Sequence, residues 1–175
     1  RSRPVEHRMK AAAFDAYLRM EGLDHIAAER ARRGEASREG RFAKGDLILC
    51  ESPTYLGALN AFQVFRPRYK EVPTDDDGMI IEELERLIKE ERPKIIYVIP
   101  DFQNPTGRSW PLERRYAFME VVKKHRVPVI EDAPYAEVRF EGVDRMALKS
   151  FDTEGLVVYL GTFSKIFCPG IRLAW

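Results

Sequence analysis

Short apolar runs recur along this chain and alternate with segments of helical periodicity. The runs cover residues 47–50, 95–99, 127–130 and 156–160, and residues 69–72 form a further candidate strand. Runs this short and this uniformly apolar are typical of strands buried on both faces of a sheet. Their alternation with helices predicts an α/β fold, in which a mainly parallel sheet is sandwiched by helices.

The chain consists of two parts that differ in their sequence pattern. Apolar residues recur at helical spacing in residues 53–65, 79–91 and 111–125, which lie between the predicted strands. Residues 1–44 differ, because they are rich in Arg and Ala, contain few β-branched residues and are expected to be only partly helical. The regular pattern covers residues 45–175, which we expect to form the folded domain.

A lysine follows the last apolar run, in the segment GTFSKIFCPGIR at residues 161–172. Desolvation next to a buried strand lowers the pKa of an amine, and a neutral amine attacks carbonyl carbons. We therefore expect Lys165 to be partly buried among Phe163, Ile166 and Phe167. Hydroxyl groups and an arginine in the same segment suit a phosphate, and an aldehyde that carries a phosphate is pyridoxal 5'-phosphate (PLP).

Two further polar segments follow predicted strands. The segment PDFQNPTG at residues 100–107 follows the second run, and EDAPY at residues 131–135 follows the third. Open α/β sheets bind ligands at the carboxyl ends of their strands. The fold and the chemistry therefore place these segments and the lysine segment at one edge of the sheet.

Together, the three segments resemble the class I and II aminotransferases, the type I fold of PLP enzymes. The resemblance covers residues 45–175, with the three motifs in the family's order, and implies part of a large PLP-binding domain. It implies that Lys165 forms a Schiff base with PLP and that Asp132 pairs with the pyridinium nitrogen. It also implies that Tyr135 and Asn104 hydrogen-bond the phenolic oxygen of the ring.

The same resemblance implies which residues bind the phosphate of PLP and which residue stacks on the face of its ring. Thr162, Ser164 and Arg172 correspond to phosphate ligands, and a guanidinium fork suits phosphate geometry. Tyr55 corresponds to the aromatic residue that stacks on the cofactor. The implied reaction is amino-group transfer between an L-amino acid and a 2-oxo acid. The EDAPY segment is similar to the branch that handles 2-aminoadipate, aromatic or branched-chain amino acids.

Each of these residues also has a purely structural interpretation. Asp132 could cap a helix or pair with an arginine, because a buried carboxylate needs a partner. Asn104 could only begin a turn, and Lys165 and Arg172 could lie on the surface. Tyr55 and Tyr135 could be packing residues.

Composition excludes several other classes of protein. The net charge of +1 gives no overall field for nucleic acid or an anionic membrane, and no apolar run has transmembrane length. The acidic turn at residues 75–77 lacks the remaining ligands of a calcium loop, so we predict no metal. Cys50 and Cys168 lie in apolar stretches, which predicts buried free thiols and a cytoplasmic location.

The resemblance is incomplete at both ends of the chain. Family members are roughly twice as long and add a small C-terminal domain, with an arginine for the substrate carboxylate, that has no counterpart here. A glycine-containing phosphate loop is also missing before residue 45. We therefore expect a piece of an aminotransferase whose parent is a homodimer. The alternatives are an inactive fragment and the PLP-sensing module of a transcription regulator.

Overall fold

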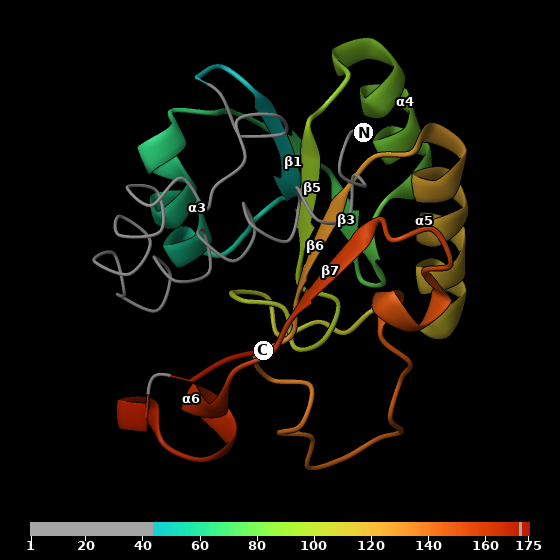
Figure 1. Ribbon diagram of the computed structural model, residues 1–175. Helices are drawn as coiled ribbons and strands as arrows, with labels where there is room; N and C mark the ends of the chain where they lie inside the picture. Colours follow the sequence, from blue (N-terminus) through green and yellow to red (C-terminus); the bar gives the residue numbers. More distant parts are fainter. Residues whose placement is uncertain (1–43, 172) are drawn as a thin grey trace.

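A five-stranded parallel sheet forms the centre of the computed structural model, which describes residues 44–171 and 173–175 (Figure 1). The strand order is β2-β1-β5-β6-β7, and each neighbouring pair is parallel. The strands are β1 (Leu47–Glu51), β2 (Arg68–Val72), β5 (Ile95–Val98), β6 (Val129–Asp132) and β7 (Val157–Leu160). This arrangement confirms the prediction of a mainly parallel sheet.

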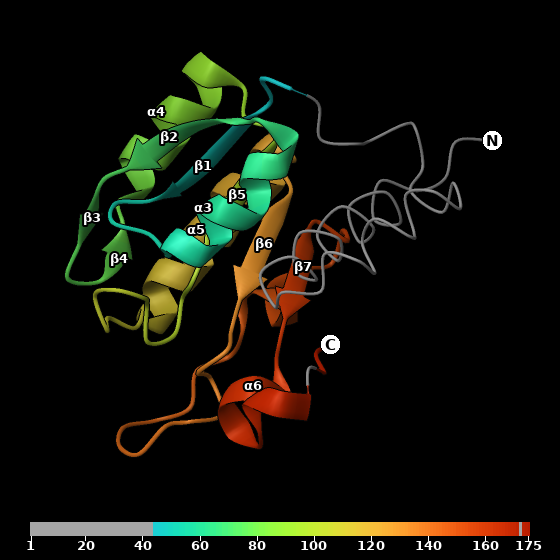
Figure 2. The ribbon, with the colours of Figure 1, turned by 90° about the vertical axis from the view of Figure 1, so that its left-hand side faces the viewer.

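Helices cover both faces of this sheet, as predicted (Figures 1 and 2). Helices α4 (Ile81–Glu91) and α5 (Leu112–His125) lie on one face, and α3 (Leu56–Phe62), extended by a 3-10 turn over Gln63–Phe65, lies on the other. Because parallel neighbours need crossover connections, this layered arrangement follows from the strand order.

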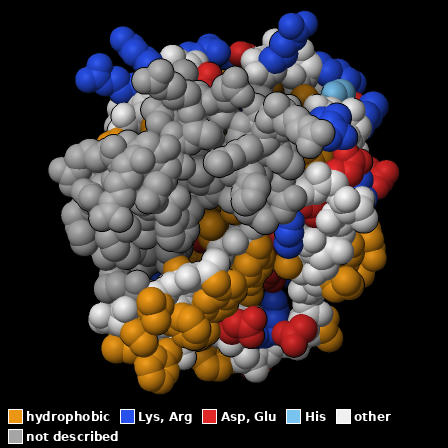
Figure 3. Space-filling view, viewed as in Figure 1, with side chains coloured by type: hydrophobic (Ala, Val, Ile, Leu, Met, Phe, Trp, Pro, Cys, Tyr) orange, Lys and Arg blue, Asp and Glu red, His pale blue; other side chains and the backbone are white. Residues whose placement is uncertain are grey.

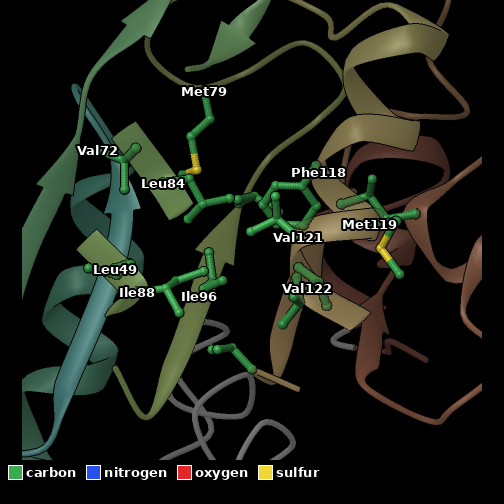
Figure 4. Close-up of a cluster of buried hydrophobic side chains, with 14 of the residues drawn as sticks. Leu49, Val72, Met79, Leu84, Ile88, Ile96, Phe118, Met119, Val121 and Val122 are labelled. Carbon is green, nitrogen blue, oxygen red and sulfur yellow. The ribbon is translucent and has the colours of Figure 1, made fainter. Parts of the chain in front are cut away.

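Side chains alternate between two hydrophobic clusters, one on each face of the sheet. Leu47 and Leu49 of β1 pack with α4 and α5, whereas Ile48 and Cys50 pack with α3. Figure 4 shows the cluster under α4 and α5. All residues of β1 and β5 are buried, which is why these two strands appear in the sequence as mostly apolar runs.

The structure also contains elements that the sequence pattern did not predict. A short antiparallel hairpin, β3 (Thr74–Asp75) and β4 (Gly78–Met79), occupies the expected turn at residues 74–78, so α4 begins two residues later than expected. Gly78 has φ +103°, and the indole of Trp110 lies where a β-carbon would be, at 2.2 Å. The other additions are α6 (Phe163–Ile166) and two 3-10 turns, Leu148–Phe151 and Pro169–Ile171.

The helices expected before residue 44 lie outside the described residues. Within the described part of the chain, no helix combines the length and the apolar character needed to cross a membrane.

Candidate active site

The deepest part of the candidate site joins β5 and β6. Tyr97 pairs with Ile130 across these strands, and Asp132, two residues further along β6, points to the same face. The hydroxyl of Tyr97 donates a hydrogen bond to Oδ2 of Asp132, with an O–O distance of 2.5 Å. Asp132 thus ends a buried strand with its carboxylate held by a tyrosine of the neighbouring strand.

Tyr97 is enclosed on all sides. Its side chain has no exposed surface, and Phe62 of α3 packs edge-on against its ring at 5.7 Å. Burial, together with the negative charge of Asp132, raises the pKa of Tyr97 well above its usual value. The tyrosine therefore stays protonated and acts as the donor. The sequence does not mark this residue, because a tyrosine inside an apolar run is indistinguishable from a packing residue.

Lys165 and Tyr135 lie close together beyond the carboxyl ends of β6 and β7. The Nζ atom of Lys165, on α6, lies 5.9 Å from the centre of the Tyr135 ring. Helix α6 follows β7 directly and extends past the edge of the sheet (Figure 2). Two of the predicted site residues, 30 positions apart in the sequence, are thus brought together by the parallel order of their strands.

The predicted burial of Lys165 is wrong in this structure. Lys165 is exposed, and so are Phe163, Ile166 and Phe167 around it. Helix α6 is a single turn beyond the sheet, anchored by backbone bonds such as that from Phe163 N to Leu173 O at 3.0 Å. On this projecting turn the side chains of Phe163, Lys165 and Ile166 face solvent, and Ser164 alone of the four is buried.

The predicted phosphate ligands lie at the start of this turn. Thr162 and Ser164 are both buried, and Oγ1 of Thr162 accepts a hydrogen bond from the backbone N–H of Ser164 at 3.0 Å. Thr162 therefore caps α6. Arg172, the third predicted phosphate ligand, lies outside the described residues.

Asn104 lies in the loop between β5 and α5, close to the same end of the sheet. It is half-buried, and its side chain makes no hydrogen bond to any residue that the structure describes. The neighbouring Gln103 holds the loop, because its Nε2 donates to Pro53 O at 2.7 Å and its Oε1 accepts from Thr106. The loop is thus fixed by Gln103, and the amide of Asn104 is not used by the described residues.

Tyr55 precedes α3 and packs against the hydrophobic cluster that contains Tyr97. Its ring lies directly on Gly57, where an added β-carbon would be only 2.3 Å from Tyr55 Cζ. The packing interpretation of Tyr55 is therefore satisfied by the structure. Its stacking on a cofactor stays a prediction.

Glu51 is a buried carboxyl group that sequence analysis did not single out. It ends β1, and its carboxylate accepts hydrogen bonds from Ile99 N at 2.9 Å and from Trp110 Nε1 at 3.1 Å. These bonds tie both ends of the loop that carries Asn104 to β1. Burial raises the pKa of Glu51 to about 8.

Glu131 faces away from Asp132, as expected for its neighbour in a strand. Its carboxylate accepts hydrogen bonds from the backbone N–H groups of Leu148 at 2.7 Å and Lys149 at 2.9 Å. Burial raises the pKa of Glu131 to about 7. Its position therefore assigns it to the support of the following loop and leaves the site to Asp132.

These two raised pKa values predict how stability depends on pH. Both lie above the ordinary value of 4.5, so unfolding releases protons and their contribution is fully present only below about pH 4.5. We expect the free energy of unfolding in urea to fall from about pH 5 to about pH 8. Glu51→Gln should flatten this dependence. The exposed Glu113→Gln should leave it unchanged, and a flat wild-type profile would contradict the assignment.

Asp101 joins the loops that follow β5 and β6. Its Oδ1 accepts hydrogen bonds from Arg115 at 2.8 Å and from Arg139 at 3.0 Å. Arg115 is fully buried in α5, and Arg139 follows the turn that contains Tyr135. One carboxylate therefore fixes the spacing between the two loops that carry Asn104 and Tyr135.

Both cysteines are free thiols, as expected, but only one is buried. Burial raises the pKa of Cys50 to about 12, so it is an inert core residue. Cys168 is exposed, which corrects the prediction of a buried thiol, because it lies in the projecting segment after α6.

The geometry agrees with comparisons to known proteins. The sequence profile of the family "Aminotransferase class I and II" matches residues 31–175. This chain belongs to that family. The membership accounts for the parallel sheet and for the three motifs at its carboxyl edge.

The relatives include an aminotransferase and a protein named as a transcriptional regulator. The chain is 43% identical over 136 residues to aromatic-amino-acid aminotransferase 1 of Thermococcus litoralis, covering 75% of this chain and 33% of that protein. It is also 37% identical to the uncharacterized HTH-type transcriptional regulator YisV of Bacillus subtilis, covering 78% of this chain and 28% of the regulator.

This chain is also similar to a solved structure that contains a bound ligand. It is LysN, the α-aminoadipate aminotransferase of Thermus thermophilus, in complex with N-(5'-phosphopyridoxyl)-L-leucine. The TM-score is 0.72 at 38% identity, covering 76% of this chain and 35% of LysN. The chain spans about a third of the length of the curated relatives it matches.

Membership in this family implies PLP as the cofactor, and the donors at the carboxyl edge fit it. Asp132 offers a buried carboxylate for a cationic ring nitrogen, and the amide of Asn104 has no described protein partner. Lys165 offers an amine beside the hydroxyl-bearing ring of Tyr135. The residues present therefore match the polar groups of the pyridine ring and its aldehyde.

Proposed function

We propose that residues 45–175 are part of the large, cofactor-binding domain of a PLP-dependent aminotransferase. The parent enzyme transfers an amino group from an L-amino acid to a 2-oxo acid. The observation that carries this proposal is the meeting of the Lys165 amine with Tyr135 at the sheet edge where Asp132 ends β6. No single motif would bring an amine, a phenol and a buried carboxylate to the same edge.

Each side chain then has a task in the reaction. PLP, when bound, supplies an electron sink for the negative charge that develops at the α-carbon of the amino acid. Asp132 keeps the proton on the ring nitrogen, and Asn104 and Tyr135 hydrogen-bond the phenolic oxygen. Lys165 would hold the cofactor at its aldehyde carbon and, as a free amine, would move the proton at the α-carbon of the amino acid.

The remaining residues hold the cofactor in place. Thr162, Ser164 and Arg172 bind its phosphate, and Tyr55 stacks on its ring. Two of these assignments draw support from position, because Thr162 and Ser164 are buried at the start of α6, three residues and one residue before Lys165.

We propose aromatic amino acids or 2-aminoadipate as amino donors. The support comes from the names of the relatives, an aromatic-amino-acid aminotransferase and an α-aminoadipate aminotransferase. The donor is identified by adding each amino acid to the PLP-loaded protein and following loss of the cofactor's visible band. Equal responses to all amino acids, or to none of these, would contradict the assignment.

A second candidate function is a PLP-sensing module, because the chain is also similar to a regulator of the HTH type. Such a module binds the cofactor without transferring amino groups, whereas an aminotransferase converts it to its amine form. Formation of pyridoxamine phosphate by the loaded protein with a donor favours the enzyme. Binding without conversion, together with retention on specific DNA by the parent protein, favours the regulator.

We further propose a homodimeric parent and a cytoplasmic location. Apolar side chains are exposed around α6, and Figure 3 shows hydrophobic side chains gathered at that end of the molecule. They belong to Phe163, Ile166, Phe167, Ile171, Leu173 and Trp175. Exposed groups of this kind mark association surfaces. The free thiols of Cys50 and Cys168 suit a reducing compartment. Light scattering of the parent protein tests the dimer, and fractionation tests the location.

The decisive experiment is titration of the purified chain with PLP, followed by borohydride reduction and peptide mapping. We expect a visible absorbance band and a pyridoxyl group on Lys165. Label scattered over surface lysines, or no band, would contradict the proposed function and favour the alternative of an inactive fragment.

A further inference from the structure

The hydrogen bond between Tyr97 and Asp132 joins two buried side chains. Both residues are at most 5% exposed, and they come from neighbouring strands of the same sheet. The edge-on contact with Phe62 fixes the ring of Tyr97, so its hydroxyl cannot turn away from the carboxylate. The strands therefore determine the direction of the hydrogen bond, with no adjustment by flexible loops.

The hydrogen bond also influences the charge on Asp132. Burial disfavours an ionised carboxylate, and a donated hydrogen bond favours it. The pKa of the Tyr97 hydroxyl is raised, first by burial and then by the electrostatic effect of Asp132, Glu51 and Tyr55. The tyrosine therefore keeps its proton and is the donor. Without this donor, Asp132 would bind a proton more readily and would lose the charge needed to hold a cationic ring nitrogen.

We propose that Tyr97 is a positioning residue of the site, whose hydroxyl keeps the Asp132 carboxylate ionised and fixed for the protonated ring nitrogen of PLP. This inference rests on the proposed function. It adds a residue that acts through Asp132 and that lies inside a strand, outside the three motifs.

The test compares two tyrosine-to-phenylalanine substitutions in the same hydrophobic cluster. Tyr97→Phe removes only the hydroxyl and keeps the ring against Phe62. Tyr69→Phe is the matched control, because the Tyr69 hydroxyl donates to Leu59 O at 2.9 Å and the ring packs against the same cluster. Both variants lose one tyrosine hydrogen bond, but only the first loses a bond to Asp132.

PLP affinity, measured by absorbance titration, is the first readout. We expect Tyr97→Phe to weaken binding about tenfold, as is typical for a lost hydrogen bond to a charged group, and Tyr69→Phe to change it less than about twofold. In an Asp132→Asn background, Tyr97→Phe should have little further effect, because the charge it supports is gone. Equal affinities of wild type and Tyr97→Phe would overturn the proposal.

The second readout needs no cofactor, so it separates this inference from the proposed function. The carboxyl carbon of Asp132 is titrated by 13C NMR in the apo protein, where the nearby titratable groups include Tyr97, Glu131 and Tyr159. Tyr97→Phe should raise the pKa of Asp132, and Tyr69→Phe should not. If wild type fails to bind PLP but this rise is seen, the proposed function fails, and only the effect of Tyr97 on the Asp132 carboxylate stands. An unchanged pKa in Tyr97→Phe would overturn the role of Tyr97.

Discussion

Replacing Lys165 with Arg should abolish attachment of PLP to the chain. Arginine keeps the positive charge but stays protonated and cannot attack the aldehyde, so labelling after borohydride reduction should fall by at least about 100-fold. The measurement is the mass of the labelled peptides that span α6. The variant should fold normally, because Lys165 is exposed and projects from a single helical turn.

Lys94→Arg is the matched control for this substitution. Lys94 is also exposed, lies at the opposite end of the sheet just before β5, and its side chain makes no ion pair with any described residue. Its replacement should leave labelling unchanged. Labelling of Lys165→Arg at the wild-type level would mean that another lysine carries the cofactor, and the assignment of the site would then be wrong.

Replacing Asp101 with Ala should cause a large loss of stability. Asp101 is the carboxylate that both Arg115 and Arg139 contact, and the Arg115 side chain is completely inaccessible to solvent. Removing one partner leaves a buried positive charge uncompensated, which costs about 3–5 kcal/mol in similar cases. Urea denaturation of wild type and variant measures the loss.

Asp76→Ala is the matched control, because it also removes the aspartate of an aspartate–arginine ion pair. Asp76 contacts Arg108 at 2.7 Å, but its side chain is 94% exposed. Exposed ion pairs contribute at most about 1 kcal/mol, so this variant should unfold close to wild type. If the two aspartate variants lost equal stability, the distinction between the buried and the exposed pair would be contradicted.

Most of the sheet could be predicted from the sequence because the inner strands β1, β5 and β6 are buried along their whole length. Residues 95–99 and 156–160 contain only apolar or aromatic side chains, and both became strands nearly as expected. The hairpin at residues 74–79 could not be predicted in the same way. Its strands are two residues long, and they depend on Trp110, which packs onto Gly78 from more than 30 positions away.

Residues of the candidate site could be predicted where they belong to a local motif. Residues whose role depends on a contact distant in the sequence could not. Lys165 and Asp132 stand out because charged residues follow apolar runs. The roles of Tyr97 and Glu51 depend on partners 35 and 48 or more positions away, which no local pattern reveals. The exposure of Lys165 could not be predicted from the sequence either, because it depends on which residues pack over α6.

The strand order has a consequence for how the chain assembles during synthesis. β1 is the first strand of the described chain, and each later strand joins the sheet beside one already made: β2 and β5 on either side of β1, then β6 and β7 in turn. Among these five described strands, none has to be inserted between two that are already paired. As the ribosome releases this region from its amino end, the sheet can grow outward without reopening, and the α6 turn is the last of these helices to emerge.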